Sequence, residues 1–361
     1  MAKILVLYDS WMREDAEDLW RKALMDALGE DFRGHDVSFI ENIEGSYRWS
    51  TEIKDGVKEA YGDPNHIMSN MSGVEAVLSG YAPFTRQIIE ACPTLRLIGI
   101  SRGGPVNVDH QAASDRGIVI LKTVGRNAVS VADQTMGLIL SESRNIARQN
   151  HDLKTGRYFQ EYRTRGRQKY MDSFRWVELE GKTLGLIGYG QVGSKVSKRA
   201  LVFGMKVLVY DPYLDEEVIT KDGCVKADLD TLLKESDFVS IHASLTPETK
   251  HMINERTLSL MKPTAVIINT ARGGIIDEAA LFRALKENRL HGAALDVFEE
   301  DPIKQSNPLL ELDNVTVTPH SSGRSPEVEL RGYMQVAQQT TAFVMGLDVD
   351  PTYVSNREVL R

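Results

Sequence analysis

Short apolar runs alternate with amphipathic stretches along most of the chain. In the first third, the apolar runs predict strands at residues 4–8, 37–40, 74–78, 95–100 and 118–121. Between them, residues 14–28 and 85–92 carry apolar side chains at helical spacing. Strands that alternate with helices in this way are typical of an α/β protein with parallel sheets.

The same alternation begins again in the middle of the chain. A long helical pattern covers residues 127–151, with Val131, Met136 and Ile139 on one face. Predicted strands follow at residues 183–187, 206–210, 238–241, 265–269, 291–295 and 315–317. A last helical stretch covers about residues 326–345. The simplest arrangement places residues 1–126 and 325–361 in one domain. Residues 127–324 then form a second domain, inserted between two long linking helices.

A glycine-rich turn follows the first strand of the second series. Residues 188–193 read Gly-Tyr-Gly-Gln-Val-Gly, and the next strand ends at Asp211. In a dinucleotide site, Gly188 permits the tight turn, Gly190 lets the backbone approach the pyrophosphate, and Gly193 lets the helix pack on the strand. Free N–H groups at the helix N-terminus, near Gln191 and Val192, attract the anion.

The acidic residue completes this fingerprint. Asp211 would accept hydrogen bonds from the adenosine ribose hydroxyls. Pro212 and Tyr213 follow it, and no arginine stands there to receive a 2′-phosphate, which favours NAD over NADP. Three glycines alone occur in many α/β proteins, so the prediction depends on the whole strand–turn–helix–strand–acid order.

Composition narrows the class of protein. A chain of 361 residues suits two domains, and its net charge of −8 argues against nucleic acid or an anionic membrane as a partner. The two cysteines, Cys92 and Cys224, lack metal-type spacing, so we expect no metal site and a reducing compartment.

The first apolar run is short and is followed closely by charged residues, which favours a strand over a signal peptide. No stretch approaches the length of a membrane span. We therefore expect a cytoplasmic protein.

Polar side chains follow three strands of the second series, where ligands bind in open α/β sheets. Arg272 follows the first and is placed to meet an anion, although an arginine can also simply cap a strand. An acidic run, residues 296–301, follows the second. His320 follows the third, after Thr318 and Pro319. By themselves, an acidic loop is usually solvated and a lone histidine is more often structural than functional.

One segment departs from the alternation. Residues 153–176 mix seven cations with six aromatic side chains. This segment, which we term the arm, is most simply a solvated loop or a subunit contact. A direct role in holding an anionic substrate is the alternative, and nucleic-acid binding is disfavoured by the other signals.

Several motifs together resemble the D-isomer-specific 2-hydroxyacid dehydrogenase family, which includes phosphoglycerate and glyoxylate/hydroxypyruvate dehydrogenases. They are Asn-Ala-Val-Ser-Val-Ala-Asp at 127–133, Leu-Glu-Gly-Lys-Thr-Leu-Gly at 179–185, Leu-Thr-Pro-Glu-Thr-Lys-His at 245–251, and the three loops above. The resemblance runs from about residue 74 to 344. It implies two Rossmann-like, doubly wound domains with an active-site cleft between them. It also implies NAD-dependent interconversion of a D-2-hydroxy acid and its 2-oxo acid.

The family carries an Arg–Glu–His catalytic trio. Arg272 and His320 match two members, whereas the position of the glutamate, immediately before a proline, is Asp301. The resemblance implies that His320 is the general acid/base, that Arg272 holds the substrate carboxylate and polarises the reacting oxygen, and that the acid orients His320. Glu300 is an alternative to Asp301 for that last role.

The resemblance also implies binding residues. Thr270, Ala271, Asp296 and Gly323 would lie along the cofactor, with Asp296 near the nicotinamide carboxamide. Backbone groups of the first domain would face the substrate at Ser79, Gly80, Tyr81, Arg102, Gly103 and Gly104. Arg102 adds a cation that suits a larger or doubly anionic acid, unless it forms an ion pair within its own domain. Sugar acids or phosphorylated acids are thus favoured over lactate or glycolate.

Partners and rival functions follow from the same resemblance. We expect a homodimer formed through the NAD-binding domain, with the arm reaching toward the partner. The rival function is an NAD(H)-sensing, corepressor-like binding protein on the same fold. A formate-dehydrogenase-like chemistry is less favoured, because that subfamily carries an amide where this chain has Asp301.

Overall fold

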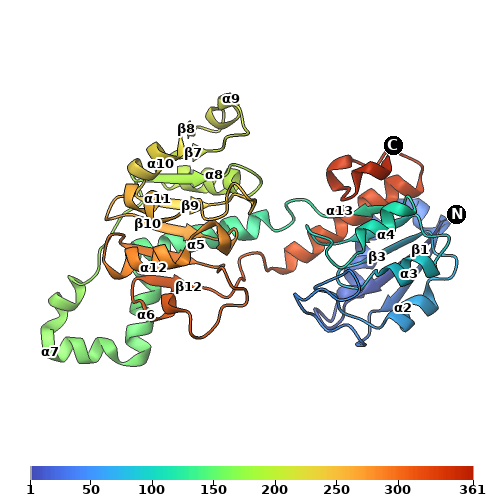
Figure 1. Ribbon diagram of the computed structural model, residues 1–361, viewed down its shortest axis with the longest axis horizontal. Helices are drawn as coiled ribbons and strands as arrows, with labels where there is room; N and C mark the ends of the chain where they lie inside the picture. Colours follow the sequence, from blue (N-terminus) through green and yellow to red (C-terminus); the bar gives the residue numbers. More distant parts are fainter. Residues whose placement is uncertain (1, 361) are drawn as a thin grey trace. The chain divides into compact units, whose positions relative to one another are not determined.

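The computed structural model describes residues 2–360 and divides into two compact units (Figure 1). Unit 1 contains the described residues up to Arg126 together with those from Ser325 onward, and unit 2 contains Asn127–Arg324. The polypeptide therefore leaves unit 1 once and returns to it once.

Unit 1 is built on a five-stranded parallel sheet in the order β2-β1-β3-β4-β5. The strands are β1 (Lys3–Tyr8), β2 (Asp36–Glu41), β3 (Ala76–Ser79), β4 (Leu97–Ile100) and β5 (Val119–Leu121). The helices are α1 (Ala16–Leu28), α2 (Pro64–Asn70), α3 (Arg86–Ala91), α4 (His110–Asp115) and α13 (Pro326–Val344), with short 3-10 turns at Gly29–Gly34, Pro351–Tyr353 and Arg357–Leu360.

Alternate residues of these strands face two separate cores. Leu5 and Leu7 pack with apolar residues of α2, α3 and α4, while Ile4 and Val6 pack with α1 and α13. On the second face, the rings of Trp20 and Tyr333 stack with their centroids 4.3 Å apart. Because both faces are covered, the strands read as continuous apolar runs in the sequence.

Unit 2 is built on a seven-stranded parallel sheet in the order β12-β11-β10-β9-β6-β7-β8. The strands are β6 (Thr183–Ile187), β7 (Lys206–Tyr210), β8 (Val225–Lys226), β9 (Phe238–Ile241), β10 (Val266–Asn269), β11 (Gly292–Leu295) and β12 (Val315–Val317). The helices are α5 (Ala128–Arg144), α6 (Ile146–Thr155), α7 (Arg157–Met171), α8 (Gly193–Val202), α9 (Glu216–Thr220), α10 (Leu229–Glu235), α11 (Glu255–Leu260) and α12 (Glu278–Lys286), with 3-10 turns at Gly273–Ile275 and Pro308–Glu311.

The strand order of unit 2 reverses beside β6. From β6 the chain first adds β7 and β8 on one side, and then β9 to β12 on the other. Ligands of doubly wound sheets bind outside the carboxyl ends of the strands at this point. The parallel α/β architecture predicted from the sequence is confirmed, although the two-residue strand β8 was not predicted.

The predicted helix at residues 127–151 is wrong in its extent. Asn145 adopts a left-handed conformation (φ 55°) and separates α5 from α6. Asparagine tolerates this conformation better than most residues. Its side chain also donates a hydrogen bond to the Arg175 carbonyl at 2.9 Å.

The arm at residues 153–176 is mostly helical, rather than the loop favoured by its composition. Gly156 (φ 82°) ends α6, and α7 follows with one non-helical residue at Gly166 (φ 80°). In Figure 1, α7 projects away from the sheet of unit 2. Most of its side chains are exposed, so no apolar stripe marked the helix in the sequence. Across the described residues 2–360, no helix is both long enough and apolar enough to cross a membrane.

Candidate functional site

The glycine turn of unit 2 joins β6 to α8. Gly188 has a φ of 94°, and an added Cβ would lie 2.8 Å from the backbone nitrogen of Ala243. A Cβ on Gly193 would overlap the carbonyl oxygen of Gly188. Gly190 differs, because a Cβ there would meet no atom of the chain within 4 Å. The turn is therefore closed toward the protein and open at Gly190, which is the shape that a pyrophosphate requires at a helix N-terminus.

Asp211 lies at the end of β7, next to this turn. Its Oδ2 accepts a hydrogen bond from the N–H of Tyr189 at 2.9 Å, and its Oδ1 accepts one from the N–H of Tyr213 at 3.0 Å. Each carboxylate oxygen can accept a second bond, so both remain able to bind a ribose hydroxyl. The residues present thus fit a dinucleotide, with the acid also fixing the turn.

Two residues near the turn were not singled out from the sequence. The hydroxyl of Tyr189 donates to Asp222 at 3.0 Å, and burial raises the pKa of this phenol, so it stays protonated. His242 follows β9, and its Nε2 lies 2.9 Å from the hydroxyl of Ser240. Burial lowers the pKa of His242 to about 3, so its imidazole is neutral. The one available signal was position, because His242 directly follows β9 and Tyr189 comes two residues after the end of β6.

His320 lies in the loop after β12, in contact with an acid from the loop after β11. Its Nδ1 is 2.5 Å from Oδ2 of Asp301. About half of each side chain is exposed. The carboxylate of Glu300 instead pairs with Lys304. Of the two acids considered for His320, Asp301 is the one in contact.

The backbone of His320 is held in an unusual conformation. Its φ is 51°, in the left-handed region, and its N–H donates to the carbonyl of Asp296 at 2.8 Å. A non-glycine residue in this region costs free energy that surrounding contacts must offset, and such residues cluster at functional sites.

Those contacts come mainly from Asp296, which is fully buried. Its Oδ1 accepts hydrogen bonds from the Thr318 hydroxyl at 2.5 Å and the Ser321 N–H at 2.9 Å. Its Oδ2 accepts from the N–H of Ser322 at 3.0 Å and from the hydroxyl of Ser322. All of these donors belong to the His320 loop. The side chain of Asp296 thus holds that loop, and its place near the nicotinamide carboxamide stays a prediction.

Arg272 follows β10, the strand next to β11. Its side chain is exposed, and its guanidinium donates to the carbonyl of Ala271 at 2.7 Å. The next residue, Gly273, packs so closely on the acidic loop that a Cβ would overlap the carbonyl group of Phe298. The arginine loop and the acidic loop are therefore in direct contact. An exposed guanidinium in this position is available to an anion.

The remaining cofactor candidates surround the same edge of the sheet. Thr270 is buried, with its hydroxyl 2.9 Å from that of Thr135 on α5, and the N–H of Ala271 donates to the side chain of Asn269. A Cβ on Gly323 would lie 2.8 Å from Nδ2 of Asn127.

In unit 1, the backbone N–H groups after β3 that were predicted to face the substrate already donate hydrogen bonds within the protein. The N–H groups of Gly80 and Tyr81 both donate to Oδ2 of Asp9, at 3.2 Å each. Asp9 also accepts from the side chain of Asn42 at 2.8 Å. Burial raises the pKa of Asp9 to about 6. Ser79 is buried as well, and its hydroxyl accepts from the N–H of Ala82. These N–H groups are therefore engaged within unit 1, and their contact with a substrate stays a prediction. Asp9, which follows β1 directly, was missed.

The loop after β4 fits the expectation for an open backbone. Gly103 and Gly104 are exposed, and a Cβ on Gly104 would meet nothing within 4 Å. Arg102, by contrast, forms an ion pair with Glu59 of the same unit.

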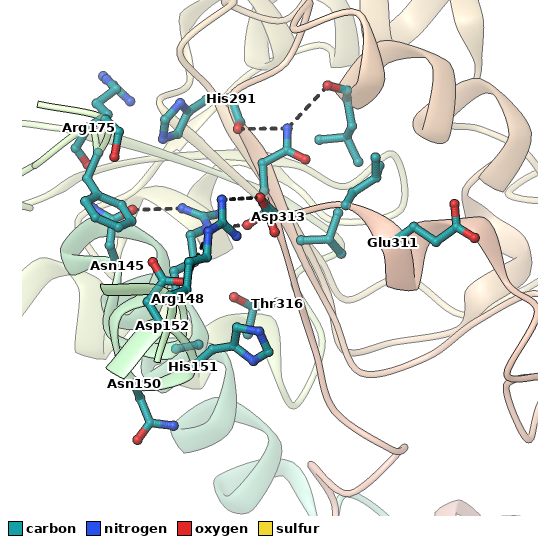
Figure 2. A pocket seen from close by; sticks show the side chains of 18 of the residues that line it. Asn145, Arg148, Asn150, His151, Asp152, Arg175, His291, Glu311, Asp313 and Thr316 are labelled. Atoms are coloured by element: carbon teal, nitrogen blue, oxygen red, sulfur yellow. Dashed lines mark hydrogen bonds and ion pairs between the residues drawn. The ribbon is translucent and has the colours of Figure 1, made fainter. Parts of the chain in front are cut away.

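A cavity of about 880 Å³ in unit 2 lies apart from these residues (Figure 2). It is lined by α6, α7, the end of α12, the turn at Pro308–Glu311, β12 and neighbouring loops. Arg148 crosses it, donating to Asn145 at 2.9 Å and to the carbonyl of Asp313 at 2.9 Å, and it pairs with the buried Glu142. Arg157 of the arm pairs with Asp313 at 2.7 Å. These pairings fix the base of the arm to the rest of unit 2 and neutralise the charges of Arg148 and Arg157.

Over residues 2–360, no group of three or more His, Cys, Asp or Glu side chains is arranged to hold a metal ion.

The chain is similar to known proteins in sequence and in fold. The profile of the D-isomer specific 2-hydroxyacid dehydrogenase NAD binding domain matches residues 136–322, within unit 2. The chain is 42% identical over 257 residues to a hydroxypyruvate reductase from Thermotoga maritima, covering 71% of this chain and 79% of that protein. It is also 42% identical over 263 residues to a D-3-phosphoglycerate dehydrogenase from Methanocaldococcus jannaschii, covering 73% of this chain. In that relative the match spans only 48% of the length.

Solved structures agree over almost the whole chain. A D-lactate dehydrogenase from Aquifex aeolicus, complexed with NAD and lactic acid, has a TM-score of 0.68 and 29% identity. The alignment covers 98% of this chain and 99% of that one. The TT0316 protein from Thermus thermophilus has a TM-score of 0.69 and 26% identity, with 98% and 99% coverage.

Proposed function

The chain belongs to the D-isomer specific 2-hydroxyacid dehydrogenase family, and on that premise we propose that it interconverts a D-2-hydroxy acid and its 2-oxo acid. NAD is the cofactor. The observation that carries the proposal is the contact between His320 and Asp301, in the same unit as the open glycine turn. An imidazole oriented by a carboxylate is the arrangement that a general acid/base requires.

The geometry supports defined roles in proton transfer. With Asp301 ionised, Nδ1–H of His320 donates to it, which leaves Nε2 to exchange a proton with substrate. In oxidation, Nε2 takes the proton of the C2 hydroxyl, and in reduction it returns that proton to the carbonyl oxygen. Asp301 stabilises the imidazolium formed in between. Bound NAD supplies the acceptor or donor of the C2 hydride.

Arg272 and Asp296 would act on the substrate and on the loop, respectively. Arg272 binds the substrate carboxylate and polarises the C2 oxygen, for which its exposed guanidinium is suited. Asp296 is a positioning residue, since its bonds to the 318–322 loop hold His320 in its left-handed conformation.

Cofactor contacts are assigned to the turn and to the edge of the sheet. Gly188, Gly190, Gln191, Val192 and Gly193 would surround the pyrophosphate, and Asp211 would bind the ribose. Thr270, Ala271 and Gly323 would line the nicotinamide half. In unit 1, the open backbone of Gly103 and Gly104 is the better candidate for a substrate carboxylate, because Gly80 and Tyr81 donate to Asp9.

The test is NADH oxidation against a panel of 2-oxo acids, from glyoxylate and pyruvate through hydroxypyruvate to sugar-derived and phosphorylated acids. His320→Gln should abolish most of the turnover by wild type while NADH still binds with unchanged affinity. If wild type binds NADH but turns over none of these acids, the enzyme proposal fails and the NAD(H)-sensing alternative takes its place.

We further propose a homodimer formed through unit 2, with the arm in the interface. Phe159, Tyr162 and Trp176 expose 51%, 49% and 42% of their surfaces, which gives the arm apolar area for a subunit interface. Light scattering should give twice the chain mass. Phe159→Ser with Tyr162→Ser should shift the protein toward monomer, and a wild type that is monomeric at all concentrations would refute the proposal.

A further inference from the structure

A long segment of unit 1, residues 42–63, connects β2 to α2 without a helix or strand of its own. Ordered loops of this length are uncommon inside a compact domain and are usually functional. The segment has a small core formed by Tyr47, Val57 and Ala60. It also bridges to itself at Tyr47 and Gly62. The segment is therefore an ordered part of the fold.

Two hydrogen bonds fix the end of this segment beside the sheet. The N–H of Tyr61 donates to the carbonyl of Tyr81 at 2.9 Å, and Nδ2 of Asn42 donates to the carbonyl of Tyr61 at 2.8 Å. Tyr81 follows β3 and Asn42 follows β2. The segment thus reaches the carboxyl edge of the sheet, where parallel sheets bind ligands.

Three aromatic rings meet at this edge. The ring of Trp11 lies 4.5 Å from that of Tyr61 and 5.3 Å from that of Tyr81, between centroids. The indole N–H of Trp11 donates to Asp9 at 3.4 Å, so the ring is tied to the residue that follows β1. Trp11 still exposes 39% of its surface, whereas the two tyrosines are half-buried. The result is an ordered aromatic surface that is partly open.

An ion pair borders the same rings. The guanidinium of Arg102 lies 4.7 Å from the ring centroid of Tyr81, pairs with the carboxylate of Glu59, and donates to the carbonyl of Glu59 at 3.2 Å. Glu59 holds a left-handed backbone (φ 49°), which a glutamate adopts only when its surroundings impose it. Only 16% of the Arg102 side chain and 25% of the Glu59 side chain is exposed.

This pairing changes what Arg102 can recognise. Glu59 neutralises its charge, and the buried carboxylate of Asp9 lies in the same group, so the surface carries no excess of positive charge. A phosphate or second carboxylate would meet the carboxylate of Glu59 beside a cation that is already neutralised, and displacing Glu59 would leave a partly buried acid unpaired, which is costly. The sequence left two interpretations of Arg102 open, a cation for a larger or doubly anionic acid or an ion pair within its own domain, and the structure has the ion pair.

We propose that Trp11, Tyr61 and the Arg102–Glu59 pair form a specificity subsite for an uncharged, hydroxylated carbon chain on the 2-oxo or 2-hydroxy acid. The inference rests on the proposed dehydrogenase function and names its substrate class: sugar-type acids longer than hydroxypyruvate. The aromatic faces cover the C–H groups of the chain. Glu59 and Arg102 offer remaining lone pairs and N–H groups to its hydroxyls.

The experiment compares kcat/KM for four acids with NADH: glyoxylate, 2-oxohexanoate, 2-keto-D-gluconate and 3-phosphohydroxypyruvate. Wild type should prefer the hydroxylated sugar acid over both the aliphatic and the phosphorylated acid by about 10-fold or more, since one unpaired polar group or charge costs about that much. Trp11→Ala should lower the ratio of 2-keto-D-gluconate to glyoxylate about 10-fold. Glu59→Gln should raise the ratio of phosphorylated to hydroxylated acid, because it frees Arg102.

A matched control and a second variant distinguish failure of the subsite proposal from failure of the dehydrogenase proposal. Trp49 lies in the same segment with 49% exposed surface and is not part of the ring cluster, so Trp49→Ala should leave all ratios at their wild-type values. Tyr61→Leu provides a second variant of the cluster if Trp11→Ala unfolds. The subsite proposal is overturned if wild type favours the phosphorylated acid, or if the ratios of Trp11→Ala match those of wild type. In either case, turnover of glyoxylate still supports the dehydrogenase proposal. If NADH binds but none of the acids is turned over, both the subsite proposal and the dehydrogenase proposal are overturned.

Discussion

Nδ1 of His320 lies 2.5 Å from Oδ2 of Asp301, whereas the adjacent Glu300 is paired with Lys304. Asp301→Asn should therefore reduce kcat by about 10²-fold or more, because an amide can bind the wrong tautomer of His320 and cannot stabilise its charged form. Asp301→Glu should retain more activity than Asp301→Asn. Steady-state kinetics across a pH series measures both the loss and the shift of the profile.

Glu300→Gln is the matched control for that prediction. It changes the neighbouring acid of the same loop, and its ion pair with Lys304 is solvent-exposed, so little stability or activity should be lost. The reverse pattern, with Glu300→Gln inactive and Asp301→Asn active, would assign the partner of His320 to Glu300.

The glycines of the turn predict two distinct phenotypes. Gly190→Ala adds a methyl group where no chain atom lies within 4 Å, so the melting temperature should stay near the wild-type value while NADH binding weakens about 10-fold or more. Gly193→Ala places the same methyl group against the carbonyl of Gly188 and should destabilise unit 2 by about 1–3 kcal/mol. Calorimetry of NADH binding and thermal melts separate the two effects. Equal loss of stability in both variants would contradict the open side of the turn.

Helices and strands could be predicted where neighbouring residues alone determine them. Apolar runs such as residues 4–8 and 183–187 are strands, because strands covered on both faces need apolar residues throughout. Asn145 was missed for the opposite reason. Helical periodicity continues through it, and only its left-handed backbone, tied to Arg175, divides α5 from α6.

Contacts between distant residues could not be read from the chain. Asp9 accepts hydrogen bonds from the N–H groups of Gly80 and Tyr81, which follow it by 71 and 72 positions, and nothing near Asp9 in the sequence indicates this. The pairing of Arg102 with Glu59 is similar, because Glu59 lies in a segment without periodicity. Asp301 and Glu300 are neighbours of like charge, so only side-chain geometry distinguishes them.

The buried pair of Arg148 and Glu142 predicts a stability effect away from the active residues. Only 1% of the Glu142 side chain and 14% of the Arg148 side chain is exposed. Arg148→Met should cost about 3 kcal/mol or more, since it leaves a buried carboxylate without its partner. Burial already raises the pKa of Glu142, and losing Arg148 raises it further, so the deficit should shrink at low pH, where Glu142 is protonated.

The double variant supplies the control for this pair. Arg148→Met with Glu142→Gln removes both charges and keeps an oxygen to accept from Thr316, so it should recover most of the lost stability. Urea unfolding at pH 5 and pH 8 measures both effects. A double variant as unstable as the single one would show that packing, rather than the unpaired charge, carries the cost.

Two buried groups predict opposite pH dependences in the two units. Burial raises the pKa of Asp9 in unit 1 to about 6, above its unfolded value of about 3.9, so its contribution to stability is present at low pH and is lost as pH rises through about 6. Burial lowers the pKa of His242 in unit 2 to about 3, below its unfolded value of about 6.5. Its contribution is therefore present at neutral pH and is lost as pH falls.

Differences between variant and wild type isolate the two groups from the remaining charges. The melting temperature of Asp9→Asn, relative to wild type, should rise as pH increases from about 4 to 7, because the variant has no carboxyl group to ionise. The relative melting temperature of His242→Gln should rise as pH decreases over the same range, because the variant has no imidazole to protonate. A constant offset from replacing either side chain does not affect these slopes. A zero slope in either variant would mean that its group has the same pKa in the folded and unfolded chain, and slopes of the same sign would mean that one of the two pKa shifts has the opposite direction.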